Sequence, residues 1–196
     1  MCKFSESTKQ KLGNAIVYIA HHTTSLSKTK LLKLLYLMEE RMALKYHVPF
    51  IGIPYEVWQA GPVAKDVFID LSDGPYLLKS FVVTEFKDGG TFIKPIADFD
   101  DNEFSECEIE MMDEVLKKYG NMTASDLVSE THKKGTLWYR TAARTGVLES
   151  FNKHECNNSD QLIDFTEAMT DCVAESYRES LNIRLTANLL NAESHV

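Results

Sequence analysis

One segment, residues 28–46, limits what this chain can fold into more than any other. Apolar side chains recur along it at the three- and four-residue spacing of an α-helix, and Ser27 stands at the N-cap position. The two apolar strips consist of Leu31, Leu34, Leu35, Met38 and Met42, and of Leu32, Tyr36 and Ala43. A helix that is apolar around so much of its circumference is packed between neighbours. The sequence therefore predicts a helical domain built around this segment.

Further helices are expected along the chain from the same periodicity. Apolar spacing predicts helices over residues 6–21, 105–119 and 137–145. Thr123 precedes Asp126 by three residues, much like a capping box, and predicts a short helix that ends near Thr131.

Two more helices are predicted from their first residues. Gly61-Pro62 is expected to open a helix with Val63, Val67 and Leu71 facing inward, because proline suits the first helical position. Ser159 is expected to cap a long C-terminal helix, continuous or broken, that reaches Leu190. Its apolar face consists of Leu162, Phe165, Met169, Cys172, Val173 and Tyr177.

Residues 80–96 change to the two-residue period of a strand. The runs 80–86 and 91–96 are rich in Val, Phe, Thr and Ile, and Asp88-Gly89 lies between them. This pattern predicts a β-hairpin. The expected fold class is mainly α (α+β): a single helical domain over residues 1–196 with one inserted antiparallel β-hairpin.

Length and cysteine usage place the chain among globular proteins of reducing compartments. A domain of 196 residues buries roughly 70% of its surface and needs no disulfide or structural metal. The cysteines Cys2, Cys107, Cys156 and Cys172 are scattered, without a CxxC pair, and are expected to be reduced thiols. The polar N-terminus predicts no signal peptide, and no apolar run is long enough for a membrane span. We expect a cytoplasmic protein.

The charge distribution disfavours nucleic acid as a partner. The formal net charge is −8, and residues 98–114 hold nine acidic side chains and no basic one. Phosphate binding requires cations that displace condensed counterions, so we expect no binding to nucleic acid by the chain alone. Residues 1–50 carry a net charge of +5, which keeps a DNA-binding regulator open as an alternative. That alternative needs a recognition helix, and residues 28–46 are too apolar for that role.

Common catalytic signatures are absent from the sequence. It contains no phosphate-binding glycine motif, no GxSxG and no HExxH. Adjacent His21 and His22 point in different directions on a helix and are poorly placed to share a metal. Asp66 and Asp70, one helical turn apart, are typical of an exposed face. We expect no catalytic residue, no cofactor and no metal. An enzyme whose site assembles only in the folded chain, such as a Cys–His pair, remains an alternative.

Three blocks combine bulky apolar residues with a breaker or a polar anchor. They are Lys30–Tyr36, Tyr55–Val63, and Thr131-His132 followed by Trp138, the last preceded by Tyr119-Gly120. From the residues alone, Trp58 and Trp138 are expected to pack in the core. His132 is expected to donate a hydrogen bond at a helix end.

The order and spacing of these blocks resemble a known family. The chain is similar to the Panacea domain (DUF4065), the SocA-like antitoxin domain of bacteria and their phages, over about residues 8–145. Residues 150–196 would then be a C-terminal helical extension. The motif positions, expected to serve as scaffold or to bind a partner, are Lys30, Leu34, Leu35, Tyr36, Trp58, Gly61, Pro62, Val63, Thr131, His132 and Trp138.

The resemblance implies a protein-binding function rather than a reaction. Members of this family are typically encoded beside a toxin and neutralise it by binding. The chain is therefore expected to be a phage-associated antitoxin that inactivates a toxin encoded nearby by stoichiometric contact. One family member instead delivers its toxin to a protease, so an adaptor is the alternative within the family. An enzyme is the alternative outside it.

Overall fold

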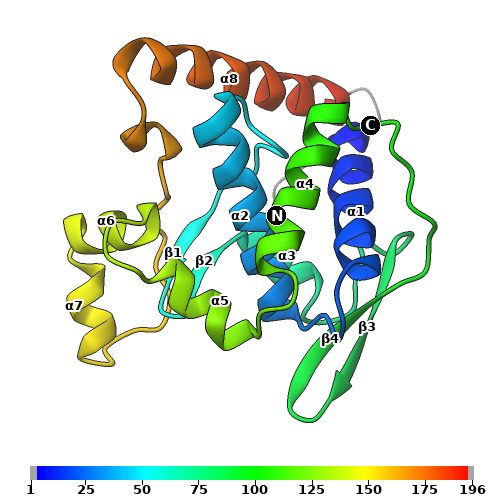
Figure 1. The fold of residues 1–196 in the computed structure, drawn as a ribbon, viewed down its shortest axis with the longest axis horizontal. Helices are drawn as coiled ribbons and strands as arrows, with labels where there is room; N and C mark the ends of the chain where they lie inside the picture. The colour runs from blue at the N-terminus through cyan, green and yellow to red at the C-terminus, as the bar shows by residue number, and fades with distance from the viewer. Residues whose placement is uncertain (1–3, 194–196) are drawn as a thin grey trace.

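The computed structural model describes residues 4–193 of the chain. The helices of this range are α1 (Glu6–His21), α2 (Lys28–Tyr46), α3 (Lys65–Asp70), α4 (Glu106–Tyr119), α5 (Ala124–Thr131), α6 (Leu137–Arg144), α7 (Val147–Asn152), the 3₁₀ helix η1 (Phe165–Ala168) and α8 (Asp171–Glu193). The strands are β1 (Glu56–Trp58), β2 (Gly61–Val63), β3 (Val82–Lys87) and β4 (Gly90–Pro95). They pair as two antiparallel hairpins, β1–β2 and β3–β4. The predicted mainly α class is confirmed (Figure 1).

Helix α2 occupies the centre of the molecule, as its apolar circumference predicts. Every residue from Lys30 to Glu39 is buried, which means that all sides of the helix are covered. Helices α1, α3, α4 and α5, both hairpins and η1 pack around it (Figure 1). The Ser27 hydroxyl accepts a hydrogen bond from the Lys30 amide and caps the first turn, as expected.

The capping signals elsewhere set helix ends where they were predicted. Ser105 and Glu108 form a full capping box at the start of α4, and Gly120 ends that helix. Thr123 and Asp126 form the second capping box, at the start of α5. Both boxes satisfy backbone N–H groups that a helix start leaves without a partner.

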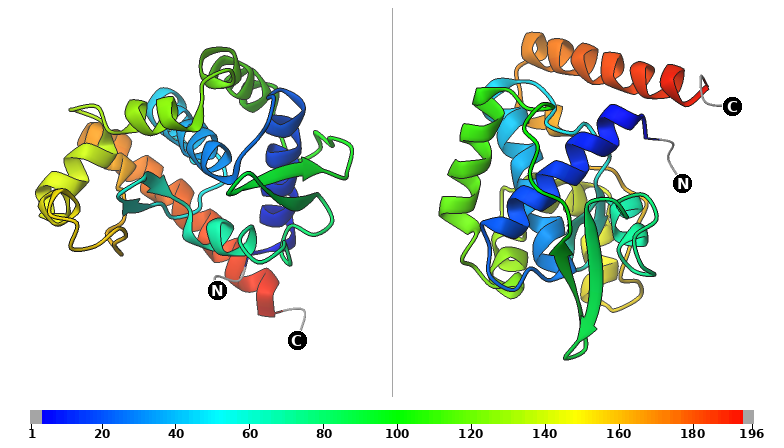
Figure 2. Two further views of the ribbon diagram at one scale, coloured as in Figure 1. Left: turned by 90° about the horizontal axis from the view of Figure 1, so that it is seen from below. Right: turned by 90° about the vertical axis from the view of Figure 1, so that its right-hand side faces the viewer.

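The β3–β4 hairpin is the one that the sequence predicts. Lys87 lies opposite Gly90, and both Asp88 and Gly89 in the turn have positive φ angles. The Ile93 amide donates to the Leu26 carbonyl at 2.8 Å, which attaches β4 to the link between α1 and α2. Beyond this attachment the hairpin projects past the helices (Figure 2).

The prediction that Gly61-Pro62 opens a helix is wrong. These residues form β2, which pairs with β1, and the fold thereby contains a second hairpin. Gly61 has a φ of +96°, a conformation outside the helical region that glycine adopts readily. Pro62 pairs with Val57 without needing an N–H on that side. Helix α3 starts only at Lys65, although Val63, Val67 and Leu71 are buried as expected.

The prediction that Ser159 caps a C-terminal helix is also wrong. The segment 157–163 is extended and lies along the free edge of β1. The Gln59 amide donates to the Asn157 carbonyl, and the Val57 amide to the Gln161 carbonyl, both at 2.9 Å. The Ser159 hydroxyl donates to the Val57 carbonyl at 2.6 Å. The backbone N–H groups on the outer edge of β1 need acceptors once that edge is buried, and the segment 157–163 supplies them.

Helix α8 begins at Asp171, later than expected, and crosses one end of the domain (Figure 1). It contacts the body along one stripe formed by Ala174, Tyr177, Leu181 and Arg184. The Arg184 guanidinium donates to the Phe50 carbonyl, in the loop that follows α2. Cys107, Cys156 and Cys172 are free thiols, and Cys2 lies outside the described residues.

Candidate functional site

The three sequence blocks meet at the turn between β1 and β2. Side chains from α2, from the end of α5 and from α6 each bind a carbonyl oxygen of this hairpin. The three carbonyls belong to Trp58, Gln59 and Pro62. We call this group the motif cluster. It consists of Lys33, Trp58–Pro62, Thr131, His132 and Trp138.

Lys33 is the most unusual member of the motif cluster because it is a buried amine. Its side chain is 1% exposed, and Nζ donates a hydrogen bond to the Pro62 carbonyl at 2.8 Å. Burial lowers the pKa of Lys33 from 10.5 to about 7, because the ammonium loses its hydration. The amine therefore ties the central helix to the hairpin, and it changes charge near neutral pH.

Gly61 leaves the space that Lys33 occupies. A Cβ at this position would lie 2.8 Å from Lys33 Cε and 2.8 Å from Thr131 Oγ1. A side chain here would displace one of these neighbours and would also strain the backbone at φ +96°. The Gly-Pro pair thus belongs to the motif because the hairpin approaches α2 and α5 closely.

His132 and Trp138 hold the other side of the turn. His132 Nε2 lies 2.9 Å from the Gln59 carbonyl, and Nδ1 lies 2.6 Å from the Val128 carbonyl at the end of α5. A neutral imidazole donates to one of these oxygens, and an imidazolium donates to both. The indole N–H of Trp138 donates to the Trp58 carbonyl at 3.0 Å, and the ring centres of Trp138 and His132 lie 3.8 Å apart. The expected hydrogen bond of His132 at a helix end is confirmed.

The remaining motif residues divide between core and surface. Lys30, Leu34, Leu35, Tyr36 and Val63 are all buried. Trp58 is partly buried and packs against the core, in line with the expectation, although it is not fully enclosed. Its ring packs against Phe68, and its indole N–H donates to the Glu56 carboxylate at 2.9 Å. Its partial exposure follows from its position at the end of β1, beside the turn.

The sequence reasoning missed a buried carboxylate on the central helix, that of Glu39. Glu39 is 1% exposed and accepts hydrogen bonds from the amides of Phe50, Ile51 and Gly52, at 2.9 to 3.2 Å. Burial raises the pKa of Glu39, and the three amides oppose that rise. The available signal was an acid within the apolar circumference of the central helix.

Several polar residues considered for chemistry instead maintain the fold. The Asp70 carboxylate accepts from the amides of Tyr76, Leu77 and Leu78, at 2.7 to 3.1 Å. In the acidic stretch, Glu108 pairs with Lys11 at 2.6 Å, and Asp113 accepts from the Tyr18 hydroxyl. Within residues 4–193, no group of three or more His, Cys, Asp or Glu side chains is arranged to hold a metal ion.

The sequence that builds this site also matches a known family. Residues 31–139, a little over half of the chain, match the model of the antitoxin SocA-like, Panacea domain. The chain belongs to this family. The Panacea match contains the whole motif cluster, whereas α7, η1 and α8 lie beyond its end. Curated proteins and solved structures provide no match. None of the described helices combines the length and apolarity needed to cross a membrane.

Proposed function

We propose that this Panacea chain is a cytoplasmic antitoxin that binds a protein toxin encoded beside it and neutralises it by direct contact. The family match over residues 31–139 carries the proposal, since the family is defined as antitoxin-like. The complex is stoichiometric, with one chain covering one toxin. The chain acts without catalysis, and it does not bind nucleic acid on its own.

The hydrogen bonds of the motif residues favour a binding function over an enzymatic one. The polar groups of Lys33, His132 and Trp138 are all engaged with hairpin carbonyls. Lys33 is enclosed by Gly61 and Thr131 and opens to no described cavity. A catalytic group must reach a substrate, and these groups reach only the protein backbone. The motif cluster thus serves as a rigid support for a surface elsewhere.

Energetics also permit neutralisation by contact alone. A typical specific interface buries about 1,600 Å² in total, and nanomolar affinity corresponds to about −12 kcal/mol. A domain with an accessible surface of 10405 Å² can provide its half of such an interface.

The test is a titration of toxin activity against purified chain, with the product of the adjacent reading frame as the toxin and no protease present. Inhibition that is complete near one equivalent is the expected result. Full protection at a tenth of an equivalent indicates an enzyme. Protection that requires an added protease and ATP indicates an adaptor. Either of the last two results overturns the proposal.

A further inference from the structure

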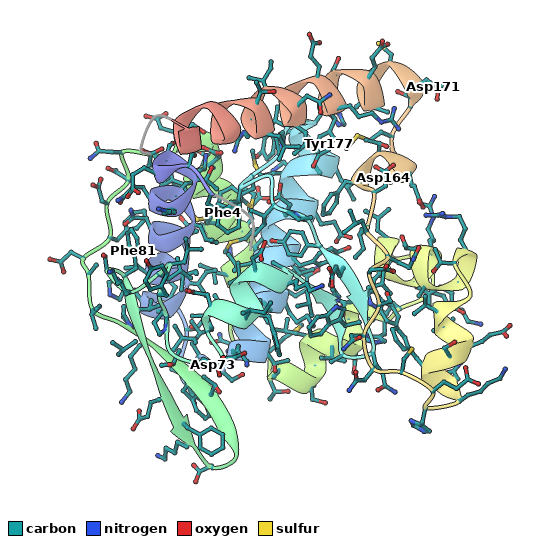
Figure 3. The ribbon with its side chains drawn as sticks, turned by 180° about the vertical axis from the view of Figure 1, so that it is seen from behind. Phe4, Asp73, Phe81, Asp164, Asp171 and Tyr177 are labelled. Carbon is teal, nitrogen blue, oxygen red and sulfur yellow. The ribbon has the colours of Figure 1, made fainter. Side chains whose placement is uncertain are left out.

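A furrow lined by Phe4 and by residues of α3 lies on one face of the molecule. Figure 3 shows this side, with Phe4 and Asp73 labelled near α3. Two hollows make up this furrow, and they share Phe4 and Asp66 as lining residues. The first has a volume of about 170 Å³ and lies between α3 and the loop 73–77. The second has a volume of about 270 Å³ and lies between α3, Ile53 and Pro54. We call these hollows together the α3 furrow.

Hydrogen bonds between α3 and the following loop fix the shape of the first hollow. The Asp70 carboxylate binds three consecutive amides, those of Tyr76, Leu77 and Leu78. This contact fixes the returning loop against α3, and Gly74 turns that loop at a φ of +89°. The walls are therefore in place before a ligand arrives, which lowers the entropic cost of binding.

The surface of the first hollow combines apolar and acidic groups. Ile69 is 47% exposed and Tyr76 is 73% exposed, so both apolar surfaces are open to a partner. Asp66, Asp70 and Asp73 supply the charged part of the lining, and no basic side chain takes part in it. The volume of about 170 Å³ leaves room for one long side chain.

Two basic groups lie beside the hollow without lining it, Lys28 and Lys79. Lys28 attracts Asp73, but its Nζ donates to the Ser72 hydroxyl and lies 4.1 Å from the Phe68 ring centre. Lys79 lies 5.3 Å from the ring centre of Tyr76. A guanidinium that enters the hollow would meet carboxylates, and it would share the ring of Tyr76 with Lys79.

The second hollow accepts a different side chain. Its lining is mostly apolar, from Ile53, Pro54, Ala64 and Val67. The charged pair at its rim, Glu56 and Lys65, is joined at 3.3 Å and presents no net charge. An apolar residue next to a basic one would fill both hollows.

We propose that the α3 furrow is the docking site for a basic and apolar segment of the partner protein, with an arginine seated in the first hollow. The inference rests on the proposed function for the partner's identity as a toxin. Charge complementarity supports it, because the hollow carries three carboxylates on a chain of net charge −8. Arginine seated in a preformed pocket is a common energetic centre of protein interfaces.

A pair of matched double variants tests the proposal. Ile69→Ser with Asp73→Lys alters the first hollow, whereas Glu179→Lys with Ile183→Ser makes the same kinds of change on exposed α8. Affinity for the product of the adjacent reading frame is measured by calorimetry. The furrow variant is expected to bind at least tenfold more weakly, and the α8 variant within twofold of the parent. Equal affinity of the furrow variant and the parent overturns the proposal, as does equal weakening of both variants.

A second measurement does not depend on the toxin. N-acetyl-arginine amide at tens of millimolar is added to the labelled chain, and amide chemical shifts are recorded. The shifts of Tyr76 and Leu77 are expected to move. They should move less in Asp73→Asn, and not at all with N-acetyl-glutamine amide. Unmoved signals with the arginine probe overturn the arginine site. A moved signal together with a failed neutralisation titration leaves the furrow standing and rejects the antitoxin function.

Discussion

The hairpin turn of the motif cluster and helix α3 of the furrow lie a few residues apart in sequence, yet the two regions differ in burial and in the use of their polar groups. In the cluster, polar side chains are buried and bind hairpin carbonyls, as with Lys33 on Pro62. In the furrow, carboxylates line an open hollow beside exposed Ile69 and Tyr76. The residues by which this chain resembles its family are thus largely those that no partner can touch. In the proposed function, the motif residues support the fold and exposed side chains contact the partner.

The strongest test of this contrast is removal of a large side chain from the cluster. Trp138 is 1% exposed, and its indole N–H binds the Trp58 carbonyl. Trp138→Ala should lower the free energy of unfolding by about 3–5 kcal/mol, since it leaves a cavity and an unpaired carbonyl. Chemical denaturation measures this loss. Trp58→Ala, at a half-buried position, should cost clearly less. Equal losses would mean that the two rings share one environment.

Gly61 offers a test of the close approach between hairpin and helix. Gly61→Ala adds a Cβ 2.8 Å from Lys33 Cε at a φ of +96°. Gly89→Ala is the matched control, because its φ is +77° and no other atom lies within 4 Å of its Cβ. Backbone strain costs each variant about 1–2 kcal/mol, and Gly61→Ala should lose more than Gly89→Ala. Thermal denaturation of both variants compares them. Similar melting temperatures would remove the packing argument for Gly61.

The lowered pKa of Lys33 predicts that the stability of the chain depends on pH. No such dependence is expected from the α3 furrow. The pKa of Lys33 is about 7 in the folded chain and 10.5 when solvated, so the unfolded chain binds more protons between these values. Stability should therefore rise with pH from about 7 to 10, by roughly 1 kcal/mol per unit from this group. Below pH 7 the lysine is charged in both states, and its burial penalty is constant. Denaturation at pH 7, 8 and 9 should show the rise in the parent. The rise should be weaker in Lys33→Met, and identical slopes would contradict the assignment.

The smallest expected effect is on the stability of the furrow variant. Ile69→Ser with Asp73→Lys changes exposed side chains, and surface changes of this kind usually stay within about 0.5 kcal/mol each. Its melting temperature should therefore match that of the parent while partner affinity falls. A sharp loss of stability would show that the furrow supports the fold, and the contrast between the two regions would weaken.

Local signals predicted most helices of this fold, because a helix is satisfied by neighbours in sequence. Ser27, Ser105 and Thr123 cap α2, α4 and α5 through amides three residues away. The same reasoning predicted β3–β4, whose turn is set by Asp88-Gly89. It predicted a core role for the motif residues, but not the contacts of Lys33 and His132. Those contacts join residues 29 and 73 positions apart in the chain.

What the sequence determined by itself was the central helix, its capped neighbours and membership of a helical family. Tertiary structure alone decided the two places where the local pattern was ambiguous. Gly61-Pro62 suits a helix start as well as a strand. Gly61 is a strand residue here because the side chains of Lys33 and Thr131 fill the space where a Cβ would otherwise lie. Ser159 suits a helix N-cap, yet residues 157–163 are extended because the amides of Val57 and Gln59 require acceptors. A backbone edge about 100 residues away outweighed a local preference, since a buried unpaired amide costs more than the helix propensity of a few residues.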